Sequence, residues 1–264
     1  MDLVDTHCHL YFHRYDADRD EVLRRARGAG VNRVIVPAID LESCRQALEL
    51  ATSFDGVFAA VGIHPNSSAE FDDSVLDALR RFAGASKVVA LGEIGLDYYW
   101  EKSPQAQQWR AFESQLELAI ELELPVIIHN RDASADLMKI LADWAPGAPA
   151  KLRGRLGVLH SFSAALDIAE RALALGLYLG FTGPITFKNA EELRSVARRV
   201  PVDRLLIETD APFLAPQPRR GKRNEPAYVR YINDKVAELH GVSAEEMARQ
   251  TTRNAERLFA LPID

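Results

Sequence analysis

Two histidines near the start of the chain, His7 and His9, follow a short apolar run and are separated by one residue. In an extended strand successive side chains point to opposite faces, so His7 and His9 would face one side and Cys8 the other. Imidazole is a common metal ligand, and this spacing lets both rings reach the same ion. The alternative is that one ring packs in the core while the other is solvated. The pair alone does not decide between the two.

Other histidines and carboxylates follow apolar runs at intervals along the chain. The residues that end such runs, or stand directly after them, are His64, Glu93, His129, His160 and Asp210. Together with the first pair they include five of the seven histidines, and only His13 and His240 stand elsewhere. Each residue alone could be a satisfied core side chain, but packing does not explain the placement of the whole set. We therefore expect a metal site.

The apolar runs alternate with amphipathic patterns of helical spacing. We expect strands from residue 3 and over residues 31–37, 57–63, 87–92, 124–128, 156–159, 177–182 and 205–210. We expect helices over residues 18–29, 41–54, 72–83, 104–122, 133–144, 164–175, 190–199, 226–240 and 243–259. The strands are almost continuously apolar, as in a parallel sheet covered by helices. Eight strand-helix units predict an α/β fold, a (β/α)8 TIM barrel with an additional C-terminal helix, whose strand C-terminal ends carry the active site.

Length and composition are those of one domain. The 264 residues are 47% hydrophobic, enough for a single barrel domain over residues 1–264, and no linker interrupts the alternation. Two cysteines give no disulfide framework, which suits a reducing compartment. The sequence has no charged-then-apolar leader and no apolar run of membrane length. We expect a soluble cytoplasmic protein with no membrane association and no obligate protein partner.

The net charge is −6, from 32 Lys and Arg against 38 Asp and Glu. This balance excludes a nucleic-acid-binding platform over the whole surface, so an anionic substrate needs a local basic feature. One basic cluster follows the last strand, where barrels of this kind often bind phosphate, and consists of Arg219, Arg220, Lys222 and Arg223. Such clusters are commonly only solvated, but here we favour phosphate contact. Lys188 and Arg131 are further candidates.

The number of possible ligands exceeds what one ion needs. Catalytic zinc typically uses three protein ligands and keeps one position open, whereas this set has at least four imidazoles and two carboxylates. Two divalent ions are the better interpretation, with Glu93 able to bridge them through its two oxygens. Zinc, manganese and magnesium are all compatible with imidazole and carboxylate ligands. Two ions can activate a water and stabilise the oxygens of a phosphoryl transfer, which indicates hydrolytic chemistry.

At this point the motifs resemble a known family over essentially the whole chain. The matching segments are residues 5–10, 62–65, 92–99, 125–133, 183–190, 208–212 and 222–226. In this order they resemble the TatD family of metal-dependent deoxyribonucleases, within the amidohydrolase-like TIM barrels. The resemblance implies a divalent-metal-dependent nuclease, often one that removes nucleotides from DNA 3′ ends.

The resemblance also implies two ligand sets that share Glu93. One ion would be bound by His7, His9, Glu93 and Asp210, and the other by Glu93, His129 and His160. The chain departs from the family pattern at Asn66, where a second histidine is frequent, and at Ser161 and Ala164 in the run after His160. These loop changes bear on substrate preference rather than on metal binding.

The remaining polar residues have two interpretations each. Asp210 could be a buried satisfied carboxylate, but as part of the set it is better placed as ligand and general base. Glu208 could orient a histidine or merely fill the barrel, and Asp97 could orient a histidine or be structural. His64 could contact a phosphate rather than a metal. The aromatic residues 98–100 could stack a base, or could simply pack their loop.

Three classes of function are compatible with these residues. The leading hypothesis is a phosphodiesterase, a 3′-5′ exonuclease on single-stranded DNA ends, in which Glu93 and Asp210 are catalytic. The second is a small-molecule amidohydrolase or esterase with the same metals, which would not need the basic cluster. The third is a metal-stabilised scaffold, which we rank last because structural sites are usually closed and sulfur-rich.

Overall fold

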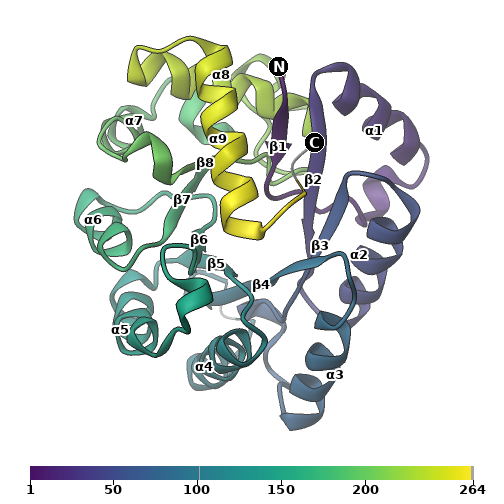
Figure 1. Cartoon of the computed structure of the whole chain (residues 1–264), viewed down its shortest axis with the longest axis vertical. Coiled ribbons are helices and arrows are strands. Elements are labelled where there is room, and N and C mark those ends of the chain that lie inside the picture. Colours follow the sequence, from purple (N-terminus) through teal and green to yellow (C-terminus); the bar gives the residue numbers. More distant parts are fainter. Residues whose placement is uncertain (101, 263–264) are drawn as a thin grey trace.

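Eight parallel strands pair in the order in which they occur along the chain. The computed structural model describes residues 1–100 and 102–262, and in it the strands form a nearly closed barrel inside a ring of helices (Figure 1). The strands are β1 (Leu3–Asp5), β2 (Val31–Pro37), β3 (Val57–Val61), β4 (Val88–Asp97), β5 (Val126–Arg131), β6 (Gly157–Leu159), β7 (Tyr178–Phe181) and β8 (Leu205–Ile207). The expected (β/α)8 TIM barrel is confirmed.

The helices follow the strands in turn. Within the described residues they are α1 (Arg19–Gly28), α2 (Leu41–Ser53), α3 (Asp73–Ala83), α4 (Gln105–Leu122), α5 (Ser134–Trp144), α6 (Leu166–Ala174), α7 (Glu191–Ala197), α8 (Val229–His240) and α9 (Ala244–Phe259). Several begin at side-chain caps: Asp40 accepts from Ser43 N before α2, and Ser243 accepts from Glu246 N before α9. No helix in the described part of the chain is long and apolar enough to cross a membrane.

The additional C-terminal helix, α9, closes one end of the barrel. A cluster of buried side chains includes at least one residue from each of the eight strands, so it fills the barrel interior. The same cluster contains Ala255, Leu258 and Phe259 of α9, and Figure 1 shows this helix lying across the centre of the ring. Because one end is filled by α9, the polar residues at the strand C-terminal ends surround the opposite, open end.

The barrel closes between β1 and β8 through residues just beyond the two strands. Cys8 and Ala211 form an isolated parallel bridge, His9 N donates to Ala211 O (2.8 Å) and Asp210 N donates to His7 O (2.8 Å). Deeper in the seam, the buried Asp5 carboxylate accepts from Thr209 N (2.9 Å) and Thr209 Oγ1 (2.6 Å). The seam therefore places the start of the chain directly beside Asp210.

Two strands extend further than the expected 87–92 and 124–128. β4 and β5 continue their ladder past a register shift, with Gly95 opposite His129 and Asp97 opposite Arg131. Polar residues that follow an apolar run resemble the start of a loop, but here backbone pairing continues through them. Glu93 and His129 therefore lie within strands rather than after them.

Candidate metal centre

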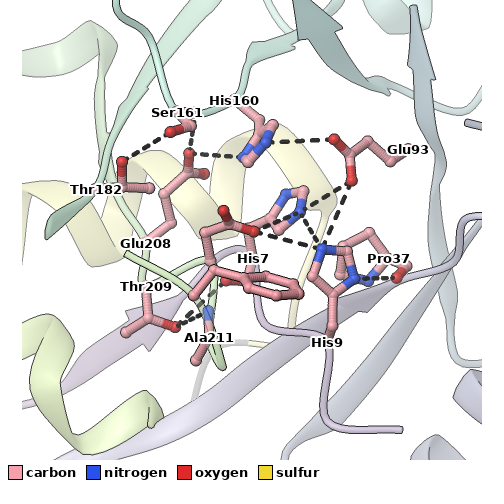
Figure 2. Close-up of polar contacts among 12 residues, drawn as sticks. His7, His9, Pro37, Glu93, His160, Ser161, Thr182, Glu208, Thr209 and Ala211 are labelled. Carbon is pink, nitrogen blue, oxygen red and sulfur yellow. Dashed lines mark hydrogen bonds and ion pairs between the residues drawn. The ribbon is translucent and has the colours of Figure 1, made fainter. Parts of the chain in front are cut away.

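Glu93 lies at the centre of the site, with its two carboxylate oxygens facing different sets of side chains. Glu93 Oε2 is 3.3 Å from His7 Nε2 and 3.7 Å from His9 Nε2. Asp210 Oδ1 completes this side, at 3.4 Å from His9 Nε2 and 3.8 Å from His7 Nε2. Figure 2 shows His7 and His9 directed toward one another and toward Glu93.

The other oxygen, Glu93 Oε1, faces three histidines from β3, β5 and β6. It is 2.9 Å from His129 Nδ1, 3.3 Å from His160 Nε2 and 3.7 Å from His64 Nε2. His129 lies in β5, whereas His64 and His160 follow β3 and β6, and in the barrel β3 and β5 flank β4, which carries Glu93. A single buried carboxylate thus joins two groups of imidazoles.

Among the described residues, three groups of three side chains have ligand atoms close enough to hold a cation. They are His7, His9 and Glu93; His7, His160 and Asp210; and His64, Glu93 and His129. Imidazole nitrogens together with carboxylate oxygens suit zinc, manganese and other divalent ions.

The hydrogen bonds of three histidines fit this role, because each has one ring nitrogen beside an acceptor outside the cluster. His9 Nδ1 lies 3.2 Å from Pro37 O, His129 Nε2 lies 3.1 Å from Asp97 Oδ2, and His160 Nδ1 lies 3.2 Å from Glu208 Oε1. Donation of the N–H to these oxygens leaves the lone pair of the second nitrogen directed into the cluster. Metal-ligating histidines are typically held in this way.

His64 has the opposite arrangement. Its Nδ1 accepts a hydrogen bond from Asn66 N (3.0 Å), so the neutral ring carries its proton on Nε2, which is directed into the cluster. Burial, with the nearby charge of His129, lowers the pKa of His64 to about 3, which keeps the ring neutral. A neutral ring with this tautomer donates a hydrogen bond into the pocket and offers no lone pair there.

The two central carboxylates stay ionised although Glu93 is buried and Asp210 is only partly open to the pocket. Burial alone would raise the pKa of Glu93, but the charges of His160 and His7 hold it well below its usual value. Burial likewise opposes ionisation of Asp210, and the hydrogen bond from His9 with the charge of His160 lowers its pKa. Ionised carboxylates among imidazoles give this site the charge that a divalent cation requires.

Two further buried carboxylates, Asp97 and Glu208, hold the histidines from behind. Glu208 lies beside His160 and accepts from Ser161 N (Figure 2). It also accepts from Thr6 Oγ1 (3.2 Å). A Cβ at Gly180 would lie 2.5 Å from Glu208 Oε1, so glycine is needed to leave room for this carboxylate. Between the two interpretations left by the sequence, these contacts favour orientation of the ring over simple filling of the barrel.

Asp97 joins the metal centre to the loop that follows β4. Its Oδ2 also accepts from Asn66 Nδ2 (3.1 Å), while Oδ1 accepts from Tyr99 N (2.9 Å) and Trp100 N (3.1 Å). Burial would raise the pKa of Asp97, but the hydrogen bonds from His129 and from Trp100 N and Tyr99 N lower it to about 2. Asn66, which departs from the pattern that the sequence resembles, is therefore part of the network around His129.

The centre opens into a pocket of about 800 Å³. Of the residues singled out from the sequence, those that line it are His9, His64, Asn66, Glu93, Asp97, Trp100, His129, Arg131, His160, Ser161, Ala164 and Asp210. His7 and Glu208 are fully buried beneath it. The pocket also has lining residues that sequence reasoning missed, namely Phe12, Lys102, Asp132, Phe213 and Leu214. For Phe213 and Leu214 the signal was their position three and four residues after Asp210.

The basic cluster after β8 is not gathered at this pocket. Arg223 donates to both oxygens of Asp18 (2.8 and 2.7 Å), and Arg219 lies over the ring of Tyr228 (5.2 Å). Lys222 is exposed and lines neither the main pocket nor the hollow beside it.

A second hollow adjoins the main pocket and shares Pro184 with it. This hollow, about 470 Å³, is lined in part by Lys188, Gln217 and Arg220, and Arg220 lies over the Phe187 ring at 4.2 Å. One residue of the basic cluster, Arg220, thus lines the same hollow as Lys188.

The three aromatic residues after β4 have different surroundings. Tyr98 packs in the loop, because its hydroxyl donates to Asp136 Oδ2 (2.8 Å) and accepts from Trp109 Nε1 (2.7 Å). Tyr99 and Trp100 are exposed, and Arg131 lies 4.1 Å and 5.7 Å from their ring centres. The packing interpretation therefore holds for Tyr98 but not for the other two.

Comparisons with known proteins match nearly the full chain. A family model described as TatD related DNase matches residues 4–260. The uncharacterized metal-dependent hydrolase YabD of Bacillus subtilis is 43% identical over 259 residues, covering 98% of this chain and 99% of its own. The 3′-5′ ssDNA/RNA exonuclease TatD of Erwinia tasmaniensis is 40% identical over 265 residues, covering 98% and 100%.

Among solved structures, YjjV, a TatD homologue from Escherichia coli K12, superposes with a TM-score of 0.91 at 35% identity, with 98% of each chain covered. A β-aspartyl dipeptidase from Fervidobacterium islandicum has a TM-score of 0.62 at 16% identity and shares the fold alone. The family match includes every residue of the cluster around Glu93.

Proposed function

Because this chain belongs to the TatD family of metal-dependent hydrolases, we propose that it is a 3′-5′ exonuclease that acts on single-stranded DNA ends with two divalent cations. Relatives at about 40% identity are named 3′-5′ ssDNA/RNA exonuclease, and others only metal-dependent hydrolase. The family establishes hydrolysis with a metal. The nucleic acid substrate, its polarity and the pair of cations are our proposal.

The observation that carries the proposal is the placement of Glu93 between two groups of ligand atoms. Its Oε2 faces His7 and His9 near Asp210, and its Oε1 faces His129 and His160. Glu93 would help to hold both cations, one together with His7 and His9 and the other together with His129 and His160. Zinc, manganese and magnesium are the candidate ions.

Bound divalent cations would lower the pKa of a coordinated water and neutralise charge on a phosphodiester. The residues of the chain then have separate tasks. Asp210, ionised and partly open to the pocket, accepts the proton of the attacking water at its carboxylate. His64 Nε2–H donates a hydrogen bond to a phosphate oxygen, as its tautomer allows. Asp97 and Glu208 keep His129 and His160 in position.

Substrate binding would extend from this pocket along its basic residues. Arg131 lines the pocket itself, and Lys188 with Arg220 lines the adjoining hollow. These cations offer contacts for phosphates next to the scissile one, on a protein whose net charge is −6. Arg219, Lys222 and Arg223 stay weaker candidates, because they line neither the pocket nor the adjoining hollow and Arg223 is paired with Asp18.

The test is digestion of single-stranded DNA labelled at its 5′ or 3′ end, in separate reactions with zinc, manganese or magnesium and with a chelator. We expect stepwise loss of nucleotides from the 3′ end that requires the metal and is absent in Asp210→Asn. Faster digestion of a matched RNA strand would show that RNA, not DNA, is the preferred substrate. Release of nucleotides from the 5′ end would overturn the proposed 3′-5′ polarity. Hydrolysis of simple amides or lactones in place of any oligonucleotide would favour a small-molecule hydrolase.

A further inference from the structure

Large apolar side chains that remain exposed are few in this protein, and they gather at the mouth of the metal centre. In the described part of the chain they are Met1, Tyr99, Trp100, Val202, Phe213, Leu214 and Val242. Three of these seven, Trp100, Phe213 and Leu214, line the pocket that contains Asp210 and His9. Three of the seven exposed apolar residues thus lie together beside the reactive centre, and such a group is typical of a binding surface.

Phe213 is an exposed residue that lies close to the metal ligand His9. Its ring centre lies 6.4 Å from that of His9 and 5.4 Å from that of Phe12, at a steep angle to both. Phe12 in turn lies 5.5 Å from His9 and stacks on Tyr11 at 5.2 Å. One side of Phe213 is therefore packed on a small aromatic cluster, while 42% of the residue stays exposed.

The turn that presents Phe213 and Leu214 is held firmly. Phe213 N donates to Asp210 O (2.9 Å), and the fully buried Asn224 donates through Nδ2 to Phe213 O (2.7 Å). Leu214 has a φ of 51°, a left-handed conformation that is unfavourable for this residue type. Its carbonyl oxygen would lie 1.8 Å from a Cβ at Gly183, so glycine is required there. Sites of this kind, strained and yet well supported, are common where a protein binds ligand.

The exposed aromatic residues Tyr99 and Trp100 differ from Phe213 in that a cationic side chain already covers their rings. Arg131 lies over the rings of Tyr99 and Trp100, so those faces already have a cationic partner. Phe213 and Leu214 offer a neutral apolar surface instead. Such a surface suits the face of a nucleobase, whereas phosphates are suited by the basic residues of the mouth.

We propose that Phe213 and Leu214, backed by Phe12, form a subsite for an unpaired nucleobase next to the scissile phosphate. This inference rests on the proposed nuclease function and adds the group that recognises the strand end. A base stacked on Phe213 leaves its partner strand, because a paired and stacked base presents only its edges. The subsite thereby favours single strands over duplex ends.

The kinetic test compares wild type with Phe213→Ala and Phe213→Trp on three oligonucleotides: one unmodified, one abasic at the 3′-terminal position and one abasic at the second position. For the unmodified strand we expect Phe213→Ala to lower kcat/KM by about tenfold, within the usual range for loss of one stacking contact. Phe213→Trp should retain activity because it keeps a stacking face. On the abasic strand that lacks the recognised base, wild type and Phe213→Ala should be equal.

Val242→Ala provides the control, since Val242 has a similar exposed fraction, 38%, in the link between α8 and α9. It should leave every rate unchanged. An equal loss for Phe213→Ala on unmodified and on both abasic strands would overturn the subsite, because the residue would then act only through the position of Asp210.

A binding measurement separates this inference from the proposed function. Chelator-treated protein is titrated into a short strand carrying 2-aminopurine at the first or second 3′ position, whose fluorescence falls on stacking. We expect quenching by wild type and Phe213→Trp but not by Phe213→Ala. Quenching by wild type, combined with no cleavage in any of the metal-supplemented digestions, would overturn the nuclease proposal and keep the subsite. Equal quenching by wild type and Phe213→Ala would overturn the subsite even if DNA is cleaved.

Discussion

Asp97 Oδ2 lies 3.1 Å from His129 Nε2, on the opposite side of the ring from the nitrogen that faces Glu93. The carboxylate also receives the backbone N–H groups of Tyr99 and Trp100, so it ties the ring to the loop after β4. The orientation of His129 therefore depends on a residue that does not itself reach the cluster of ligand atoms.

Asp97→Asn should weaken cation binding on the Glu93 Oε1 side by about 10- to 100-fold, the usual cost of losing such a partner. The amide keeps the shape of the side chain but loses the charge that favours the lone pair on His129 Nδ1. Metal affinity is measured by calorimetric titration of the chelator-treated protein. Asp73→Asn, an exposed carboxylate of α3, is the control and should bind as wild type. Unchanged metal affinity in Asp97→Asn would show that the carboxylate only stabilises the loop after β4 and does not orient His129.

Asp210→Asn should lower kcat by about 100-fold or more while the barrel stays folded, because it removes the proposed proton acceptor and one proposed ligand oxygen. Glu93→Ala should abolish turnover, since both groups of imidazoles converge on this carboxylate. Turnover is measured on single-stranded DNA, with circular dichroism and metal content measured on the same samples. Near wild-type activity of either variant at full metal content would contradict the assigned roles.

Lys188→Gln with Arg220→Gln should raise KM for single-stranded DNA and flatten its dependence on salt. Each lost phosphate contact reduces the slope of log affinity against log salt by about 0.7 for a single strand. Arg223→Gln is the matched comparison, because its charge is used by Asp18. It should leave the slope unchanged and instead cost about 1 kcal/mol of the free energy of unfolding. If the salt dependence flattened only in Arg223→Gln, Arg223 would contact the phosphates, and Lys188 and Arg220 would not.

The pair of Asp18 and Arg223 also predicts a pH dependence of stability. Hydrogen bonds from Arg223, with a smaller contribution from Arg25, lower the pKa of Asp18 to about 2, below the value of about 3.9 expected in the unfolded chain. A lowered folded-state pKa contributes stability above pH 4 that is lost as the pH falls toward 2. The free energy of unfolding should therefore differ between wild type and Asp18→Asn by a constant amount above pH 5 and converge below pH 4. Urea unfolding across this range measures it, and a pH-independent difference would refute it.

Most of the site could be predicted because its residues follow apolar runs that the barrel brings to one end. His7, His9, His64, His129, His160 and Asp210 all carry that signal, and α/β alternation alone places them together. The exact strand ends could not be predicted, since the ladder between β4 and β5 continues through polar residues.

Contacts between distant segments were beyond the reach of the sequence. Arg223 belongs to a basic cluster of the kind that binds phosphate, but it forms an ion pair with Asp18, about 200 residues earlier in the chain. The tautomer of His64 depends on a backbone N–H two residues away, whose direction only the turn determines. Phe12 and Phe213 likewise meet only because the seam joins the first and last strands of the barrel, β1 and β8.

The position of α9 has a consequence for the order of events in each turnover. Because the side chains of α9 fill the end of the barrel opposite the metal centre, the pocket has one opening and is not a channel through the barrel. In the proposed exonuclease, a released nucleotide would leave through the opening by which the strand entered. Its departure would have to precede the advance of the shortened strand, so free nucleotide and DNA would compete for the same space. We therefore expect the mononucleotide product to inhibit competitively, and digestion to pause after each step.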